Sequence, residues 1–134
     1  MDILLVEDNA GDAVLIRQIL TESPVPVHLH IARDGEQALL MLKDALFRPS
    51  LIILDLNIPR ISGLVLLERW RSINIPIVVF SSTANDKERA RVLELGAREF
   101  VQKPNDIDNY IKVVSSIIHR YSGPGNSLAG GAGA

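Results

Sequence analysis

The sequence predicts an α/β fold, in which a doubly wound, five-stranded parallel sheet lies between two layers of helices as a three-layer sandwich. Two observations support this class. Short apolar runs alternate with longer segments of helical periodicity, as expected for βα units. The apolar runs also lack polar alternation, which is typical of parallel strands buried on both faces. The length of 134 residues fits one domain with enough chain for a hydrophobic core.

Five strands are predicted near residues 2–6, 27–32, 51–55, 76–80 and 98–102. The second strand differs from the others because its apolar residues alternate with His28 and His30. This alternation favours an edge strand with one solvated face. The strand order 2-1-3-4-5 is one of the two common arrangements of a doubly wound sheet, and right-handed crossovers follow from it.

Five helices are predicted over residues 12–21, 34–47, 62–71, 84–95 and 106–121. Each segment carries apolar side chains at the spacing of one helix face. Asp34 is the predicted N-cap of the second helix. Gly96 is the predicted left-handed residue that ends the fourth helix.

The folded domain is expected to cover residues 1–121. Residues 122–134 are rich in Gly, Ala and Ser. Such a composition favours a flexible tail, or a remnant of cloning, with no fold of its own. No second domain and no internal repeat is apparent in the sequence.

The composition excludes several classes of function. There is no cysteine, which excludes disulfides, thiolate metal sites and a cysteine nucleophile. The formal net charge is −2 and there is no long basic run, so nucleic-acid binding has no electrostatic support. No secretory leader is apparent, and no apolar stretch approaches the ~20 residues that span a bilayer. We therefore expect a cytoplasmic protein that does not contact membranes.

Acidic, hydroxyl and basic side chains occur where four predicted strands end. Glu7 and Asp8 follow the first strand, Asp55 closes the third, Ser81 follows the fourth and Lys103 follows the fifth. Ligands of open parallel sheets bind beyond the carboxyl ends of the strands, so these side chains are expected to converge. Carboxylates can hold a hard cation, and a lysine with a hydroxyl can hold an anion. The set therefore suits phosphoryl chemistry.

The clustered acids point to a divalent cation. Glu7 and Asp8 are adjacent, and both are expected near Asp55, where like charges oppose ionisation. Mg²⁺ suits such a set because it takes oxygen ligands from one or two carboxylates and keeps several waters. Asp8 and Asn9 could instead cap the first helix, although capping by one is compatible with metal binding by the other. Asp55 alone could cap a turn, but beside Asp8 and Lys103 it is better explained as a nucleophile that forms an acyl phosphate.

These residues lie in motifs of a known family. The motifs are Leu4-Leu5-Val6-Glu7-Asp8-Asn9, Leu54-Asp55-Leu56-Asn57 with Pro59 and Gly63, Ser81, and Lys103-Pro104. Over residues 1 to about 121 the chain resembles the receiver domain of a two-component response regulator, the CheY-like family with a flavodoxin-like fold. It most resembles the stand-alone regulators of bacterial phytochrome kinases, through Asp34-Gly35-Glu36, Ile58-Pro59-Arg60 and Glu94-Leu95-Gly96-Ala97.

The resemblance implies a phosphoprotein that acts in phosphorelay signal transduction. A sensor histidine kinase, of phytochrome type on the closer resemblance, would transfer a phosphoryl group to Asp55. Mg²⁺ would be the cofactor, bound by Asp8, Asp55 and the backbone carbonyl of Asn57, with Glu7 acting through water. The chain would not be an enzyme in the usual sense, since it would show only self-catalysed phosphoryl transfer and slow autodephosphorylation.

The resemblance also implies how the phosphorylated state is sensed. Lys103-Pro104 resembles the family's cis peptide, which would direct the lysine inward to a phosphoryl oxygen. Ser81 would bind another phosphoryl oxygen, although the hydroxyl residues at 82 and 83 follow at once and are preferred as helix caps. Phe100 would move between exposed and buried positions as Ser81 moves, and a plain packing role for this ring stays open.

Output is expected through protein contacts. A homodimer could form through the fourth helix, fifth strand and fifth helix, unless the apolar residues of the last helix all face the sheet. One alternative is a phosphohydrolase with an aspartate nucleophile, but such enzymes usually place an acid two residues later, where this chain has Asn57. Another alternative is a pseudo-receiver that only binds partners. The intact set of Asp8, Asp55, Ser81 and Lys103 argues against it.

Overall fold

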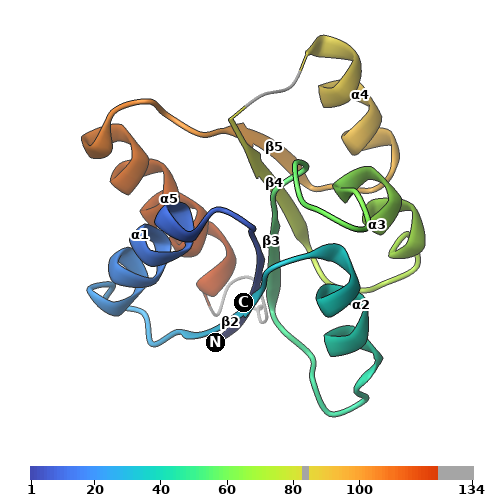
Figure 1. Cartoon of the computed structure of the whole chain (residues 1–134). Helices are drawn as coiled ribbons and strands as arrows, with labels where there is room; N and C mark the ends of the chain where they lie inside the picture. Colours follow the sequence, from blue (N-terminus) through green and yellow to red (C-terminus); the bar gives the residue numbers. More distant parts are fainter. Residues whose placement is uncertain (83–84, 124–134) are drawn as a thin grey trace.

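A computed structural model describes residues 1–82 and 85–123 and confirms the three-layer α/β sandwich (Figure 1). The five strands are parallel and follow the predicted order β2-β1-β3-β4-β5. The strands are β1 (Asp2–Val6), β2 (His28–Ala32), β3 (Leu51–Leu54), β4 (Ile77–Ser81) and β5 (Glu99–Gln102). The helices are α1 (Ala10–Thr21), α2 (Gly35–Lys43), α3 (Gly63–Arg69), α4 (Asp86–Glu94) and α5 (Ile107–Ser122). The predicted tail from residue 124 onward, like residue 83, lies outside the described residues.

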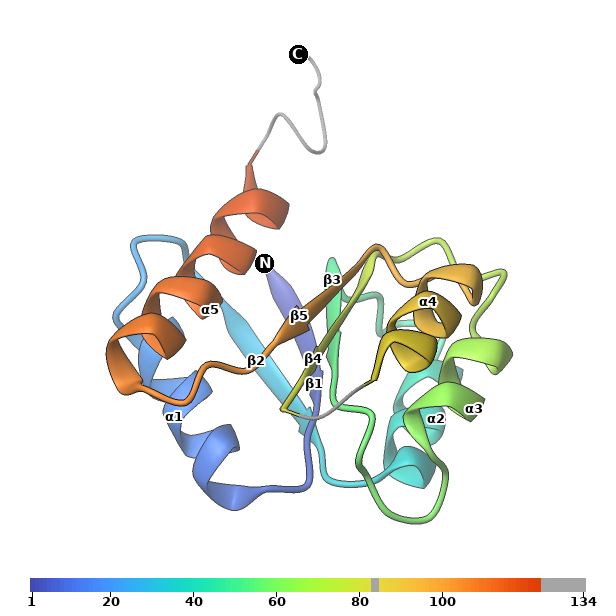
Figure 2. The ribbon, with the colours of Figure 1, turned by 90° about the horizontal axis from the view of Figure 1, so that it is seen from above.

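Alternating side chains along the strands build two hydrophobic cores, one on each face of the sheet. On β1, Ile3 and Leu5 pack with residues of α1 and α5, whereas Leu4 and Val6 pack with residues of α2, α3 and α4. Figures 1 and 2 show the same division, with α1 and α5 on one side of the sheet and the other three helices opposite. Strands β3 and β4 are buried along their whole length. This explains why their sequences are continuous apolar runs.

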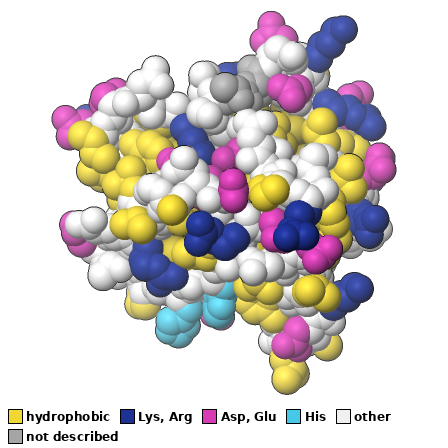
Figure 3. Space-filling view, in the orientation of Figure 1, with side chains coloured by type: hydrophobic (Ala, Val, Ile, Leu, Met, Phe, Trp, Pro, Cys, Tyr) yellow, Lys and Arg dark blue, Asp and Glu magenta, His cyan; other side chains and the backbone are white. Residues whose placement is uncertain are grey.

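Strand β2 is an edge strand, as its alternating sequence predicts. It pairs with β1, and its first residue, His28, is exposed to solvent. His28 and His30 both approach the carboxylate of Asp2 on β1, with nitrogen-to-oxygen distances of 3.6 and 3.0 Å. Figure 3 shows histidine side chains gathered at this edge of the molecule. The two histidine side chains that alternate with apolar residues along β2 therefore lie on its solvated side.

Side chains at the helix ends decide where the helices begin and stop. Asp34 is the N-cap of α2, as predicted, because its carboxylate accepts a hydrogen bond from the backbone of Gln37. Gly96, which follows the C-cap of α4, has the expected positive φ of 105°. The predicted extension of α2 to residue 47 is wrong. Asp44 adopts an extended conformation and its carboxylate accepts from the backbone of Leu46, which replaces the helical hydrogen-bond pattern.

None of the helices in residues 1–82 and 85–123 combines the length and the apolar character needed to cross a bilayer. On the face shown in Figure 3, acidic and basic side chains are intermingled.

Candidate functional site

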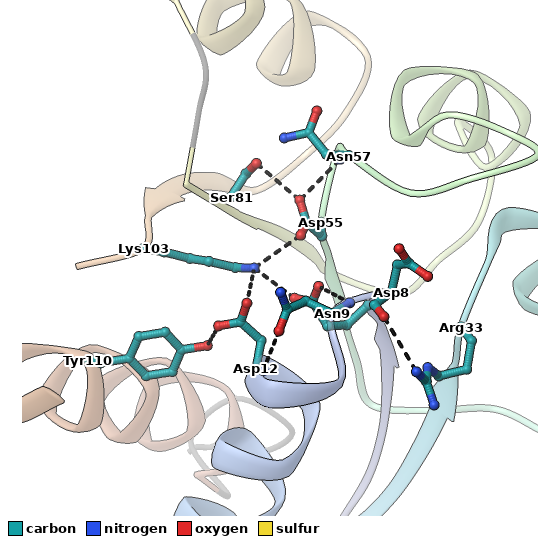
Figure 4. A network of polar contacts seen from close by, with 10 residues as sticks. Asp8, Asn9, Asp12, Arg33, Asp55, Asn57, Ser81, Lys103 and Tyr110 are labelled. Carbon is teal, nitrogen blue, oxygen red and sulfur yellow. Dashed lines mark hydrogen bonds and ion pairs between the residues drawn. The ribbon is translucent and has the colours of Figure 1, made fainter. Parts of the chain in front are cut away.

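The sheet register brings the predicted site residues to one edge. Val6 pairs with Leu54, and Leu54 pairs with Val79, so the carboxyl ends of β1, β3 and β4 lie at similar levels. The backbone amide of Asp55 donates to the carbonyl of Val6 at 3.0 Å, and that of Lys103 donates to the carbonyl of Ser81 at 2.9 Å. Figure 4 shows the resulting cluster of polar side chains.

The ammonium group of Lys103 lies at the centre of this cluster. It donates to Glu7 at 2.8 Å, to Asp55 at 3.0 Å and to Asp12 at 3.2 Å, all measured from Nζ to a carboxylate oxygen (Figure 4). The Lys103 side chain is 7% exposed. An ammonium has three donor hydrogens, so each can be matched to one carboxylate. The lysine thus joins the ends of β1 and β3 to the first turn of α1.

Asp55 is held through both carboxylate oxygens. Its Oδ1 accepts from the Ser81 hydroxyl and from the Asn57 backbone amide, each at 3.1 Å, while its Oδ2 accepts from Lys103. The Ser81 side chain is buried and that of Asp55 is 9% exposed. The carboxylate is therefore fixed in orientation by three donors before any ligand arrives.

Glu7 is a buried acid with both oxygens occupied. Its Oε1 accepts from Lys103, and its Oε2 accepts from the backbone amide of Asn9 at 3.1 Å. Burial raises the pKa of Glu7 to about 7, although the Lys103 ammonium opposes this shift. Burial also disfavours the Lys103 ammonium, but its hydrogen bond and attraction to Glu7 and Asp55 prevail and raise the pKa of Lys103. The lysine therefore stays charged.

Asp8 faces solvent, in contrast to Glu7. No hydrogen bond or ion pair involving another described residue reaches its carboxylate, while its backbone carbonyl accepts from Arg33 at 3.4 Å (Figure 4). Asn9, and not Asp8, caps α1 through a bond from the Asp12 amide. The capping alternative therefore applies to Asn9 and leaves the Asp8 carboxylate available for a ligand.

The charges and donors of the site fit a hard cation such as Mg²⁺. Three carboxylates, those of Glu7, Asp12 and Asp55, contact the Lys103 ammonium, and the exposed carboxylate of Asp8 follows Glu7 directly in the chain. Across the described ranges, no group of three or more His, Cys, Asp or Glu side chains is arranged so that it could hold a metal ion. Mg²⁺ does not require three such side chains, because it is commonly held by one or two carboxylates and keeps waters.

The predicted cis peptide between Lys103 and Pro104 is wrong for this structure. Every peptide bond within residues 1–82 and 85–123 is trans. The inward direction of Lys103 has another physical reason here, namely the backbone bond to Ser81 that continues the pairing of β4 with β5. Lys103 reaches the carboxylates although the Lys103–Pro104 peptide bond is trans, the isomer that X–Pro peptides favour.

Two residues of the cluster were missed by sequence reasoning. Residue type and spacing place Asp12 at the start of the first predicted helix, 12–21, and Tyr110 within the last, 106–121, and give no indication that the two side chains meet. The Tyr110 hydroxyl donates to Asp12 at 2.6 Å, and burial raises the pKa of Tyr110 above its ordinary value. The available signal was a phenol in an otherwise aliphatic stripe, because a buried tyrosine hydroxyl usually has a partner.

Phe100 is half-buried against the core beneath α2, α3 and α4. The guanidinium of Arg89 lies 4.4 Å from the centre of its ring and also donates to Gln102 at 2.9 Å. The structure describes one position of this ring, so its movement with Ser81 stays a prediction. Its location beside α4 agrees with either a switching role or a packing role.

Comparison with known proteins defines the class. The sequence profile of the response regulator receiver domain matches residues 3–115. This chain therefore belongs to the receiver domain family of response regulators, and the predicted family is confirmed. The match includes the site residues at the carboxyl ends of β1, β3, β4 and β5.

Individual members of the family show which response regulators this chain is similar to. The chain is 32% identical over 124 residues to response regulator Rcp1 of Synechocystis sp., with 86% of this chain and 84% of Rcp1 covered. It is 29% identical to the methanogenesis regulatory protein FilR1 of Methanothrix harundinacea over 98% of this chain. It spans 30% of FilR1, and 54% of the virulence regulator PhoP of Shigella flexneri, to which it is 32% identical.

Solved structures agree with this placement. The Mn²⁺-bound form of Rcp1 matches with a TM-score of 0.84 and 30% identity, covering 90% of this chain and 94% of that one. The phosphorylated cyanobacterial phytochrome response regulator RcpA matches with a TM-score of 0.84 and 31% identity, covering 90% and 92%. The predicted similarity to phytochrome response regulators is thus confirmed.

Proposed function

We propose that this chain is a phosphorylation switch in which Asp55 accepts a phosphoryl group from a sensor histidine kinase. One observation carries the proposal: the Asp55 carboxylate is held by Lys103 and Ser81 at the end of β3, and the exposed Asp8 follows the neighbouring strand β1. The similarity to RcpA, a protein whose structure is described as phosphorylated, supports it. The similarity to phytochrome regulators favours a phytochrome-type kinase, and the same proposal places the chain in the cytoplasm.

In the proposed transfer, an oxygen of Asp55 attacks phosphorus in line with the leaving group. A P–O bond forms as the P–N bond of a phosphohistidine breaks, and the histidine nitrogen keeps the electron pair. Lys103 and Ser81, which donate to the Asp55 carboxylate before transfer, then donate to phosphoryl oxygens, where negative charge develops. The side chains act by position and charge, as is usual in phosphoryl transfer. Each chain accepts one group, so the reaction is a modification of the protein and does not turn over a substrate.

We assign the metal site to Asp8, Asp55 and the backbone carbonyl of Asn57, with Glu7 acting through water. Mg²⁺ bound there supplies positive charge to the transferring oxygens. The surplus of carboxylates supports the assignment, as does the availability of the Asp8 side chain. The Mn²⁺-bound form of Rcp1 gives independent support, since it describes a divalent ion on a close structural relative.

The experiment is incubation of the purified chain with acetyl phosphate and Mg²⁺, followed by intact mass spectrometry. We expect one added phosphoryl group in the wild type and in Asp108→Asn, a matched loss of an exposed acid in the first turn of α5 that makes no hydrogen bond or ion pair with a described residue of the site. We expect none in Asp55→Asn. Beryllofluoride, which mimics a phosphoryl group on a carboxylate, should bind the same two proteins. An unmodified wild type, or an adduct that persists in Asp55→Asn, would refute the proposal.

We also propose that phosphorylation changes protein contacts on the face formed by α4, β5 and α5, and that a homodimer forms there. Phe100 lies on β5, the strand that precedes Lys103, and its partner Arg89 lies on α4. Glu99 on β5 pairs with Arg120 on α5 at 2.7 Å, so the face carries charges that a second copy could meet. A phosphoryl group that draws Ser81 inward would alter the packing around Phe100.

A further inference from the structure

Asp12 and Tyr110 form a connection from the site to helix α5. Asp12 uses one oxygen, Oδ2, for the Lys103 ammonium at 3.2 Å. It uses the other, Oδ1, for the Tyr110 hydroxyl at 2.6 Å. Figure 4 shows Tyr110 pointing from α5 toward the Asp12 carboxylate at the start of α1. Neither residue belongs to the set assigned above to phosphoryl or metal binding.

Two contacts fix the pair in the fold, and a third fixes its partner Lys103. The Asp12 backbone amide donates to Asn9, the N-cap of α1, at 2.9 Å. The Tyr110 ring is buried and makes an edge-to-face contact with Phe80, with ring centres 5.4 Å apart. The Lys103 ammonium lies 5.9 Å from the centre of the same Phe80 ring. The carboxylate therefore has little freedom to turn away from the lysine.

The geometry points to a positioning role. We propose that Asp12, oriented by the Tyr110 hydroxyl, is a positioning residue that holds the Lys103 ammonium against Asp55 and so ties α5 to the chemistry of the site. The catalytic part of this inference rests on the proposed function, in which Lys103 contacts the transferred phosphoryl group. The tether itself, meaning the contacts from Lys103 through Asp12 to Tyr110, does not depend on the proposed function, because these contacts exist before any phosphoryl transfer.

The role follows from what a lysine needs. Lys103 is a point charge on a flexible stem, and its ammonium can turn toward any nearby anion. During transfer, the Asp55 oxygens change from carboxylate to acyl phosphate, so one of its three anchors changes character. Glu7 and Asp12 remain as anchors on either side. Without Asp12, the ammonium would shift toward Glu7 and lose alignment with the phosphoryl oxygens.

A purely electrostatic role would have the opposite consequence. The Asp12 charge repels an incoming anionic donor, so Asp12→Asn would then accelerate phosphorylation while Tyr110→Phe, which changes no charge, would leave it unaltered. A positioning role predicts that both variants slow the reaction. The two roles therefore differ in the sign of one variant and in the presence of an effect in the other.

The experiment compares Asp12→Asn, Tyr110→Phe and their double variant with wild type, and uses Tyr121→Phe as the matched control. Tyr121 is also on α5 and donates its hydroxyl to a carboxylate, that of Glu99, so the control removes the same kind of bond elsewhere. The readouts are the rate of phosphorylation by acetyl phosphate with Mg²⁺ and, by NMR, the solvent exchange of the Lys103 ammonium protons in metal-free protein. The second readout needs no phosphoryl transfer.

We expect each single variant to lower the phosphorylation rate about tenfold and to accelerate the exchange of the Lys103 ammonium protons by a similar factor. This is the size expected from the loss of one hydrogen bond to a charged group. The double variant should lose no more than Asp12→Asn, because the hydroxyl acts through Asp12. Tyr121→Phe should match the wild type. Faster phosphorylation of Asp12→Asn, additive losses, or unchanged ammonium exchange in both single variants would overturn the proposal. If the wild type accepts no phosphoryl group while exchange changes as expected, the proposed function fails and the tether stands.

Discussion

At the scale of single residues, the site is defined by a surplus of negative charge. Glu7, Asp12 and Asp55 share one ammonium, and the exposed Asp8 carboxylate adds a fourth negative group. Charges of one sign at close range raise the free energy of the folded state. A bound divalent cation reverses part of that cost, so metal binding and folding stability are linked in this molecule.

The linkage gives a prediction for Asp8→Asn. We expect Mg²⁺ to raise the thermal midpoint of the wild type, since a ligand at 100 times its Kd stabilises a folded protein by about 2.7 kcal/mol. Asp8→Asn should lose most of this gain, whereas Asp108→Asn, an equal change of charge on α5, should keep it. Without metal, Asp8→Asn should be at least as stable as the wild type, because one of the like charges is gone. Differential scanning calorimetry with and without Mg²⁺ measures each comparison, and an equal gain in Asp8→Asn would contradict the assignment of this ligand.

At the scale of elements, the start of two helices depends on glycines that let backbones approach closely. A Cβ at Gly35 would lie 2.3 Å from the Ile61 carbonyl oxygen, and one at Gly63 would lie 2.8 Å from the Cα of Leu56. Both contacts hold the loop between β3 and α3, and the first residue of this loop is Asp55. The loop that supplies the Asn57 carbonyl is therefore positioned by α2 and by the first turn of α3.

We predict that Gly35→Ala and Gly63→Ala destabilise the protein by about 1 to 3 kcal/mol each, the usual cost of forcing extra atoms into a packed region. Helix propensity alone would favour alanine at both positions. Gly11→Ala is the control, because its Cβ would meet only the end of the Asn9 side chain, at 3.2 Å, and we expect a change within about 1 kcal/mol. Urea unfolding measures all three, and stabilisation by Gly35→Ala would show that the loop can move away.

Helix α5 carries both tyrosines of the chain, and both are expected to resist ionisation. Burial, with the hydrogen bond to Glu99, raises the pKa of Tyr121 to about 12, and burial with the bond to Asp12 raises the pKa of Tyr110 as well. The pKa of Tyr121 is higher in the folded chain than in the unfolded chain, where it is about 10. The contribution of Tyr121 to the free energy of unfolding is therefore fully present below about pH 10 and is lost as the pH rises through about 12.

The measurement is tyrosinate absorbance at alkaline pH. At pH 11, unfolded chains should be about 90% ionised at both tyrosines, whereas the folded protein should show about 10% at Tyr121 and less at Tyr110. Tyr121→Phe should leave a single transition at still higher pH. Folded tyrosines that titrate near pH 10 would mean that one or both hydroxyls lack the contacts described here.

Much of this arrangement could be predicted from sequence, for a physical reason. Continuous apolar runs identify strands buried on both faces, and parallel strands present their carboxyl ends to one edge, so residues such as Asp55 and Lys103 had to meet. The contact of Tyr110 with Asp12 depends on how α1 and α5 pack, which periodicity does not specify. The early end of α2 depends on one Asp44 side chain competing with the helix, which propensity averages over.

At the scale of the whole molecule, the sheet separates two cores with different tasks. The core beneath α1 and α5 supports Tyr110, and the core beneath α2, α3 and α4 supports Phe100. Asp55 lies at the carboxyl end of β3, a strand with side chains in both cores, so phosphorylation there can affect both faces of the sheet. To move such a molecule from 1:99 to 99:1 between two states takes about 5.5 kcal/mol of differential interaction, so a partner or second copy has to contribute.

We predict that beryllofluoride with Mg²⁺ shifts the wild type toward a dimer, measured by light scattering after size-exclusion chromatography. Asp55→Asn should stay in its original state because it cannot form the adduct. Arg120→Glu should weaken the dimer, since it reverses one charge of the Glu99–Arg120 pair on the proposed face. A wild type that binds beryllofluoride and remains monomeric over a wide concentration range would exclude this form of output.

The contact between Lys103 and Glu7 joins residues 96 positions apart in the chain. A ribosome making this protein exposes the acceptor Asp55 long before the lysine has been synthesised, so a nascent chain carries the aspartate without the group that completes its clamp. The set of contacts around Asp55 is therefore complete only after synthesis has passed Lys103 and the two distant parts of the chain have folded together.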